Sequence, residues 1–387
     1  MTRAAPARSA RRSWALPAVV LALALLGGLA AWKGRRAVEV FLLTDLKVVT
    51  LAEGLDTPWS LAFLPDGRML VSERPGRVRL LDGRGGPGAV LQGLPPVWPA
   101  GGLMGIAVAA EGVEAPWVYW SYLEPAADGQ TGRNAVARGR LRGERLDAVE
   151  VIFRDPQFGP DRGSFGSRLA FGPQGHLFVT LGDRSEPAQA QRLDSYRGKL
   201  LRLQPDGSVP PDNPFVGRTG ALGAIWALGF RDPQGIEVDP KTGHAWVSDH
   251  GPLGGDEVNL VKAGANHGWP IVSYGCEEIT CAPIGEGREK PGMAPAAIWW
   301  GEDVAMPPTA VLRLDSSRYP DWRGELLVGM LSGQALLRLR VDGERLVDPR
   351  PVFVGRPKRT RDVRQGPDGW LYLVTNSPDG RVLRLER

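Results

Sequence analysis

One short unit recurs along the chain and constrains its fold more than any other feature. An apolar run is followed by a Pro-x-Gly or Asp-Gly turn, and then by a second apolar run. Such turns between apolar runs are a strong signal for a β-hairpin. The clearest copies lie at 61–71, 169–179, 236–247 and 363–374, and weaker copies lie at 106–122 and 326–341.

Six copies without a sustained helical period predict an all-β protein. Only residues 189–202 could hold a short helical turn. Repeated small sheets favour a six-bladed β-propeller over residues 48–387, because radial repetition leaves only short sheet edges. A β-sandwich is the alternative. The unequal spacing indicates insertions at 97–100, 204–218 and 274–293, and such loops are where a site would be built.

The N-terminal region predicts export. Residues 14–32 are 19 uncharged, mainly apolar residues with Trp at both ends and basic residues on both sides. This length is just enough to cross a bilayer as a helix. We therefore expect a cytoplasmic tail and membrane anchor in 1–36, a linker in 37–47, and a periplasmic or extracytoplasmic body held at the inner membrane. A cleaved signal peptide, which would give a secreted protein, remains the alternative.

Charge and cysteine content narrow the function further. The net charge is +4, and acidic residues are scattered among the basic ones, so no nucleic-acid groove is expected. The two cysteines, Cys276 and Cys281, are five residues apart. In an oxidising compartment such a pair is expected to form a disulfide that staples one loop.

The stretch 226–269 contains the densest group of polar turn residues. Residues 230–235 (FRDPQG) enter an apolar strand, and residues 250–259 (HGPLGGDEVN) combine bare backbone carbonyls with two adjacent carboxylates. Ca²⁺ takes ligands of both kinds. The sequence therefore indicates a calcium loop, with a solvated hairpin as the alternative.

Three motifs in this order resemble the soluble pyrroloquinoline quinone (PQQ)-dependent aldose dehydrogenases, the glucose/sorbosone dehydrogenase family. The family patterns are close to G-H-R-N-P-Q-G, H-G-P-x-x-x-D-E-x-N and N-Y-G-W-P, and they match 229–235, 250–259 and 266–270. The resemblance implies a propeller that binds PQQ and Ca²⁺ near its axis and passes hydride from a sugar to the quinone.

The resemblance also implies which residues bind the cofactor and the metal. PQQ carries three carboxylates, which arginine forks match well. Arg359 and Arg361, two apart on an expected strand, are predicted to share one face. The residues implied for the cofactor are Arg231, Gln234, Arg359 and Arg361. Those implied for metal are the carbonyls of Gly251 and Pro252 at the cofactor's Ca²⁺, and Asp256, Glu257 and Tyr274 at a structural or adjoining ion.

Four positions depart from the family pattern. Ser164 stands where the family has the histidine that takes the substrate proton, and serine is no general base near neutral pH. Ala100, Asp232 and Ser332 replace a glutamine, an asparagine and a lysine at further cofactor contacts. The catalytic residue is therefore left unassigned, and the other candidate proton acceptors are Asp161, Asp183, His250 and His267.

Two functions follow from these observations. The first is an exported PQQ- and Ca²⁺-dependent enzyme that oxidises an aldose at C1 to a lactone and passes electrons to a membrane carrier. The second is a membrane-tethered propeller that has lost this reaction and binds a sugar, a glycan or a protein. The four substitutions at the cofactor site are the reason to retain the second, non-catalytic function as an alternative.

Overall fold

The computed structural model describes residues 41–42, 46–83, 85–109, 114–301, 304–332, 336–354 and 359–387. The expected anchor in 1–36 and most of the linker 37–47 lie outside these ranges. Within them, no helix has the length and apolar character needed to cross a membrane. Residues 41–387 form one compact unit.

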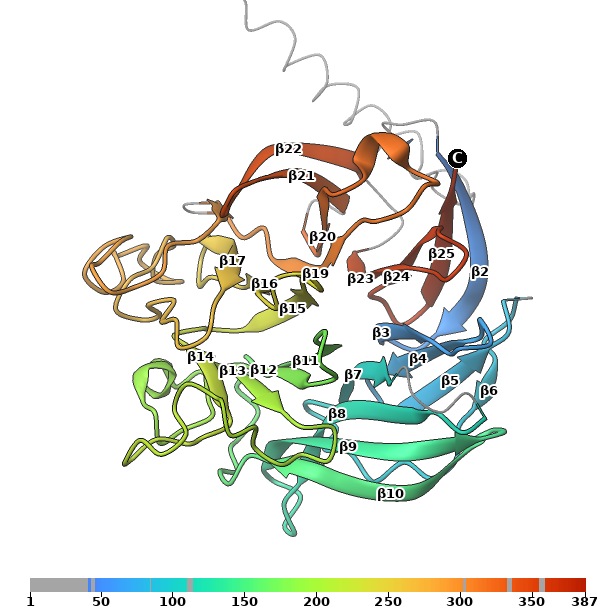
Figure 1. Cartoon of the computed structure of the whole chain (residues 1–387), viewed down its shortest axis with the longest axis horizontal. Helices are drawn as coiled ribbons and strands as arrows, with labels where there is room; N and C mark the ends of the chain where they lie inside the picture. Colours follow the sequence, from blue (N-terminus) through green and yellow to red (C-terminus); the bar gives the residue numbers. More distant parts are fainter. Residues whose placement is uncertain are drawn as a thin grey trace, which may run out of the picture. The chain divides into compact units, whose positions relative to one another are not determined.

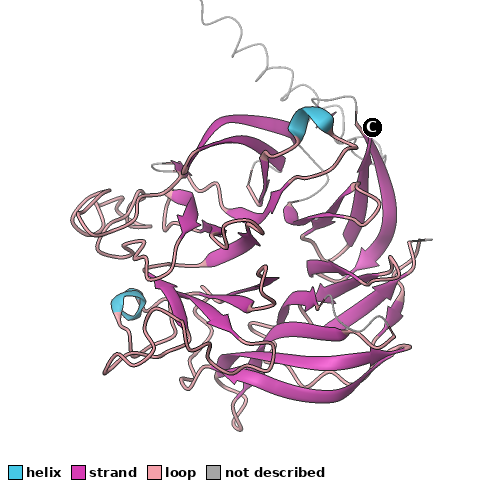
Figure 2. Cartoon of the chain, viewed as in Figure 1, coloured by secondary structure: helices cyan, strands magenta, loops and turns pink. Residues whose placement is uncertain are grey.

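This unit is a six-bladed β-propeller, as the repeats predict (Figures 1 and 2). The first blade has β3 (Pro58–Phe63), β4 (Met69–Glu73), β5 (Arg77–Leu81) and β6 (Ala89–Val90). The second has β7 (Leu103–Val108), β8 (Trp117–Pro125), β9 (Gly132–Arg142) and β10 (Arg145–Arg154). The third has β11 (Gly166–Phe171), β12 (Leu177–Leu181), β13 (Lys199–Leu203) and β14 (Ile225–Leu228).

The remaining blades complete the ring. The fourth has β15 (Pro233–Val238), β16 (Ala245–Asp249), β17 (Asp256–Val261) and β18 (Ile298–Trp300). The fifth has β19 (Pro308–Arg313), β20 (Leu326–Met330), β21 (Leu336–Asp342) and β22 (Arg345–Val354), with β1 (Phe41–Leu42) added at its edge. The sixth has β23 (Thr360–Gln365), β24 (Leu371–Thr375), β25 (Gly380–Glu386) and, from the other end of the chain, β2 (Lys47–Leu55).

The first strands of the blades surround the centre of the propeller. β3, β7, β11, β15, β19 and β23 each pack against the next, and β23 packs against β3. We call these six strands the central ring. The apolar core lies between neighbouring blades; one cluster, for example, joins Trp120 and Tyr122 of β8 to Leu70 of β4. Side chains that point inward from the central ring can therefore meet across several blades.

Five of the six sequence copies correspond to the first hairpin of a blade. The copy at 326–341 does not: it covers β20 and β21, the second and third strands of the fifth blade. The first strand there is β19. A longer connection with the 3₁₀ helix η3 (Pro320–Trp322) replaces the tight turn between β19 and β20. A second 3₁₀ helix, η2 (Pro187–Gln191), overlaps the start of the segment 189–202, where only a short helical turn was expected.

The predicted insertions all lie between strands. The largest runs from β17 to β18 and contains a disulfide between Cys276 and Cys281, as expected. The backbone of Cys276 pairs with that of Leu253 in the glycine-rich loop before β17. The disulfide therefore staples a loop that lies against the predicted calcium segment.

Candidate active site

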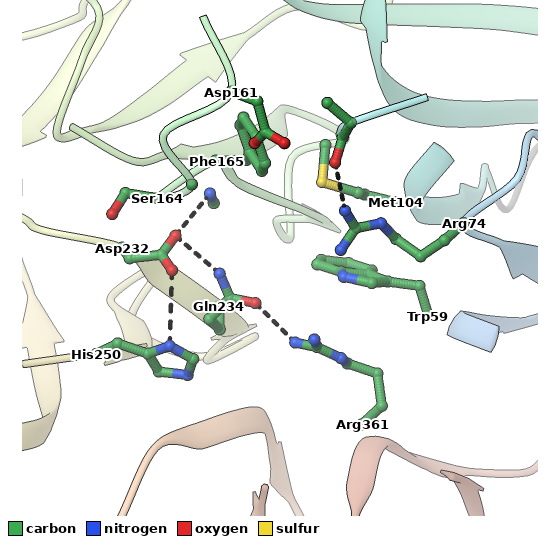
Figure 3. A pocket seen from close by; sticks show the side chains of 13 residues that line it. Trp59, Arg74, Met104, Asp161, Ser164, Phe165, Asp232, Gln234, His250 and Arg361 are labelled. Atoms are coloured by element: carbon green, nitrogen blue, oxygen red, sulfur yellow. Dashed lines mark hydrogen bonds and ion pairs between the residues drawn. The ribbon is translucent and has the colours of Figure 1, made fainter. Parts of the chain in front are cut away.

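A pocket of about 310 Å³ opens over the central ring (Figure 3). Five of the six innermost strands contribute to it, which makes it a product of the closed ring rather than of one blade. Its lining residues are Trp59, Arg74, Ala100, Met104, Asp161, Gly163, Ser164, Phe165, Gly166, Asp232, Gln234, His250 and Arg361.

Arg361 supplies a buried positive charge at the pocket. Its side chain extends from β23 and is only 8% exposed. One amino group donates to Oε1 of Gln234 at 2.8 Å, whereas Nε finds no partner among the described residues. Burial, reinforced by the neighbouring Arg168, Arg74 and Arg359, lowers the pKa of Arg361 to about 9. An anion in the pocket would relieve this accumulation of positive charge.

Arg74 adds a second cation from the first blade, next to the sixth blade that carries Arg361. It follows β4, and its guanidinium donates to the carbonyl of Ala100 at 2.9 Å. Burial lowers the pKa of Arg74, although Asp161 and Asp232 act in the other direction. The pocket therefore has two arginine forks aimed into it, and Figure 3 shows Trp59 between them.

A third arginine lies beneath the pocket and joins four blades. Arg168 of β11 is fully buried. It donates to the carbonyls of Gln234 at 2.9 Å and Arg361 at 3.1 Å, and it forms an ion pair with Asp362 at 3.1 Å. Its guanidinium lies 3.9 Å from the ring centre of Trp59. Arg168 thus fixes the backbone that carries three of the pocket's lining residues.

Asp232 faces the pocket from the turn before β15. Its Oδ1 accepts hydrogen bonds from the amide of Gly166 at 2.9 Å and from Nε2 of Gln234 at 2.8 Å. Its Oδ2 lies 3.6 Å from Nδ1 of His250. The other ring nitrogen of His250 contacts the carbonyl of Pro308 at 2.8 Å, where it must act as the donor. Hydrogen bonds therefore join Arg361, Gln234 and Asp232 in that order, and His250 lies next to Asp232.

Ser164 lies in the pocket at the position of the expected base. It has a left-handed backbone with φ 49°, and its carbonyl accepts from the amide of Arg184 at 3.1 Å. The strained turn is thus held by a backbone contact, and it presents a hydroxyl rather than an imidazole.

A second, much smaller cavity of about 10 Å³ lies beside the calcium segment. Gly251, Pro252, Glu257 and Tyr274 of the predicted calcium set line it, whereas Asp256 does not. The two oxygens of Asp256 accept from the amides of Gly251 at 3.1 Å and Met306 at 2.6 Å. Asp256 therefore caps the loop.

The charges around this cavity suit a cation. Burial and the neighbouring Asp249 raise the pKa of Glu257 well above its usual value. Asp249 itself is occupied, because it accepts from the amides of Arg231 and Asp232. Within the described ranges, no three His, Cys, Asp or Glu side chains are grouped as metal ligands. The donors that remain, one carboxylate and several carbonyls, are all oxygens, which is the set that Ca²⁺ prefers.

Arg231 lies between the two cavities. Its guanidinium donates to the carbonyl of Gly251 at 2.8 Å and pairs with Glu278 of the disulfide loop at 3.0 Å. It lines the small cavity and not the larger pocket. Because Glu278 is largely exposed, this ion pair is weak, and the arginine can exchange partners at little cost.

The other residues that the sequence singled out do not line the larger pocket. Asp183 is 1% exposed and accepts from Nε1 of Trp269 at 2.8 Å and from the amide of Ser185. His267 stacks on Phe230 and lines the small cavity. Arg359 is exposed just before β23, and neither Arg359 nor Ser332 lines the pocket.

Three residues in or next to the pocket were not predicted from the sequence, namely Trp59, Arg74 and Arg168. Arg74 ends the first repeated hairpin, at the edge where a propeller builds its site, and this was the signal available. Arg168 offered none, since a lone arginine in an apolar run gives no indication of partners on three other blades.

Comparison with known proteins agrees with this geometry. The model of the glucose/sorbosone dehydrogenase family matches residues 55–384. Aldose sugar dehydrogenase YliI of Escherichia coli (strain K12) is 35% identical over 346 residues, which span 88% of this chain and 92% of that protein.

Solved structures give the same result. The apo form of the soluble aldose sugar dehydrogenase from Escherichia coli has 33% identity and a TM-score of 0.83, covering 88% of this chain and 99% of the other. The PQQ-bound aldose sugar dehydrogenase from Streptomyces coelicolor has 28% identity and a TM-score of 0.71, covering 89% and 99%. The chain thus belongs to the glucose/sorbosone dehydrogenase family.

Proposed function

We propose that this chain is an exported PQQ- and Ca²⁺-dependent dehydrogenase that oxidises an aldose at C1 to a lactone. The observation that carries the proposal is the buried Arg361, whose Nε has no partner in the part of the chain that the structure describes and which lines the same pocket as Arg74. A buried guanidinium is costly unless a charged partner pairs with it. The pocket is therefore prepared for an anionic ligand.

The residues present fit PQQ in charge and size. Arg74 and Arg361 would pair with its carboxylates, and Gln234 would donate to it. The pocket volume of about 310 Å³ lies at the lower end of the range for small-ligand sites. When bound, PQQ supplies an ortho-quinone that accepts the hydride from C1 of the sugar.

Calcium would bind beside this pocket. Glu257, the carbonyls of Gly251 and Pro252, and Tyr274 would hold it. Arg231 now donates to the carbonyl of Gly251. A cation at that carbonyl would replace the guanidinium there and free Arg231 to pair with an anion. Ca²⁺ would serve as a Lewis acid.

The location is part of the proposal. The apolar segment 14–32 would anchor the propeller on the outer side of the inner membrane, or would be cleaved to release it. An anchored propeller lies where a membrane electron carrier could reoxidise the cofactor. This carrier and the sugar are the partners expected, and nucleic acid is not.

The test uses the purified protein with PQQ and Ca²⁺. Calorimetry is expected to show PQQ binding that a chelator weakens, and dye reduction is expected with one or more aldoses, with the lactone identified by mass spectrometry. Arg74→Met and Arg361→Met should weaken PQQ binding, whereas Arg202→Met, which alters a buried arginine elsewhere, should not. Absence of PQQ binding to the wild type would refute the proposal.

The second candidate is the non-catalytic propeller that binds a sugar, a glycan or a protein. Ser164 favours it, because the pocket has no imidazole at this position. Tight PQQ binding without oxidation of any aldose would support this alternative, and dye reduction would exclude it.

A further inference from the structure

The pocket contains few groups that can take a proton near neutral pH. Of its lining residues, only Asp161, Asp232 and His250 carry such a group. Its arginines donate hydrogen bonds only and keep their protons. A dehydrogenase that removes hydride from C1 must also remove the proton of the C1 hydroxyl, so one of these three groups has to receive it.

The environment of His250 makes its ring an acceptor toward Asp232. Because one ring nitrogen donates to the carbonyl of Pro308 at 2.8 Å, the neutral ring carries no proton on Nδ1. Its unprotonated Nδ1 therefore faces Oδ2 of Asp232 at 3.6 Å, too far apart for a hydrogen bond.

Oδ2 of Asp232 and Nδ1 of His250 are both hydrogen-bond acceptors, and neither carries a proton that it could donate to the other. A proton on Oδ2 of Asp232 would convert this unfavourable contact into an O–H···N hydrogen bond. Meanwhile Oδ1 remains fixed by the amide of Gly166 and by Gln234. The carboxylate is thus already oriented, as a general base has to be. Asp161 lies in an exposed segment, and Figure 3 draws no hydrogen bond between it and the other lining residues.

We propose that Asp232 is the catalytic base of this chain. This inference rests on the proposed function. In the step, the O–H bond at C1 breaks and its proton goes to Oδ2 of Asp232. The C1–H bond breaks with its electron pair, which passes as hydride to the ortho-quinone cofactor. The oxygen electrons form the C=O bond of the lactone, so the sugar loses two electrons and two protons and the quinone is reduced.

The charges around Asp232 suit this role. Five ionisable groups interact electrostatically with the carboxylate of Asp232. They are Arg74, Arg361, Asp183, Asp249 and His250. The guanidiniums of Arg74 and Arg361 carry the opposite charge, and the imidazole of His250 would accept a hydrogen bond from the proton that the carboxylate takes up.

The position of Asp232 also explains how the pocket could work with Ser164. The amide that binds Oδ1 belongs to Gly166, two residues after Ser164. The carboxylate therefore lies beside the turn where an imidazole would otherwise stand. An imidazole introduced by Ser164→His would lie close enough to take over the proton transfer.

The main test is Asp232→Asn, which preserves shape and can still accept from Gly166. We expect the catalytic constant to fall by about 100-fold or more, the usual contribution of a general base. PQQ affinity should be unchanged or higher, because a negative charge near an anionic ligand is removed. The matched control Asp206→Asn changes an exposed turn aspartate that also caps an amide, and it should behave as wild type.

A second variant separates chemistry from structure. Adding Ser164→His to Asp232→Asn should restore much of the lost rate. It should also shift the acidic limb of the pH–rate profile toward about 6.5, the ordinary pKa of imidazole. A purely structural role for Asp232 would show neither recovery nor shift.

Each outcome separates the hypotheses. An active wild type whose rate survives Asp232→Asn, or falls only with Asp161→Asn, would overturn the inference and leave the proposed function intact. A fall in both PQQ affinity and melting temperature in Asp232→Asn would make Asp232 structural. A wild type that binds PQQ and oxidises no aldose would overturn the proposed function first.

Discussion

Arg361 shows how binding and stability oppose each other in a single residue. Its guanidinium is buried at 8% exposure, its Nε has no partner within the described ranges, and other arginines lie nearby. Such a charge weakens the unliganded fold and strengthens the complex with an anion. The free protein therefore carries a strain that its ligand relieves.

We predict that Arg361→Met weakens PQQ binding by about 2–5 kcal/mol, the usual effect of removing one partner of a buried charge pair. The unliganded protein should keep its melting temperature or gain a little. Calorimetric titration and thermal melts measure the two effects. A variant that loses stability and retains affinity would contradict the argument.

The buried carboxyl group of Asp183 is expected to make the stability of the folded protein depend on pH. Burial raises the pKa of Asp183 to about 6, above its ordinary 3.8. The folded protein therefore binds more protons than the unfolded chain between these values. Its contribution is fully present below about pH 3.8 and is lost as the pH rises through 6.

Asp183→Asn should remove this dependence, which is on the order of 3 kcal/mol at most. Relative to wild type, the variant should be more stable at pH 7 than at pH 4, as measured by denaturant unfolding. Asp206→Asn is the control, because Ser208 lowers the pKa of Asp206 and any effect there has the opposite sign. Parallel pH curves for wild type and Asp183→Asn would refute the prediction.

Individual residues were predicted from the sequence with uneven success, for a physical reason. The motif that contains Gln234 placed it in the pocket, because its turn geometry is local. Arg359 and Arg361 were expected on one face, but β23 begins at Thr360 and its register shifts between Thr360 and Asp362. A bulge of this kind breaks the period of two, and the sequence does not announce it.

At the scale of the strands, Arg168 connects the fold to the site. The inner strands β3, β11, β15 and β23 come from different blades, and Arg168 binds residues on the other three. Asp362, its ion-pair partner, also accepts from Ser60 and the amide of Leu61 on β3. The directional hydrogen bonds of Arg168 and Asp362 fix the positions of these strands relative to one another, which apolar contacts alone would do less strictly.

We predict that Arg168→Met lowers both the free energy of unfolding and PQQ affinity, because Asp362 loses a buried partner and the Gln234 and Arg361 backbones lose theirs. Breaking a buried pair typically costs about 3–5 kcal/mol. Hydrogen exchange should rise in β15 and β23.

Arg202→Met is the matched control for this prediction. Arg202 is also buried and stacks on a tryptophan, Trp226, but its ion-pair partner Asp212 is exposed and the pocket is remote. It should lower stability alone. Equal losses of PQQ affinity in the two variants would show that Arg168 acts through general stability only.

For the whole molecule, the repeats predicted the propeller and the number of its blades but not how the ring closes. Each hairpin is local and carries its own turn signal. Closure joins β2 to β25, more than 320 positions apart, and β2 has no turn signal of its own because its only partner in the sheet is that distant strand. The same limit applies to the pocket, since its lining comes from five blades.

Closure predicts that β2 is essential although none of its residues lines the pocket. Leu51, Ala52 and Leu55 of β2 are buried against the sixth and first blades. Without them, β25 would be an unpaired edge, and the blade that carries Arg361 would have three strands.

A chain that begins at Leu46 should melt cooperatively and bind PQQ, whereas one that begins at Asp56 should aggregate or melt broadly and bind none. A synthetic peptide of residues 46–55 should restore part of the binding by adding a strand to β25. If the shorter chain bound PQQ as tightly as the longer one, the pocket would not depend on the closed ring.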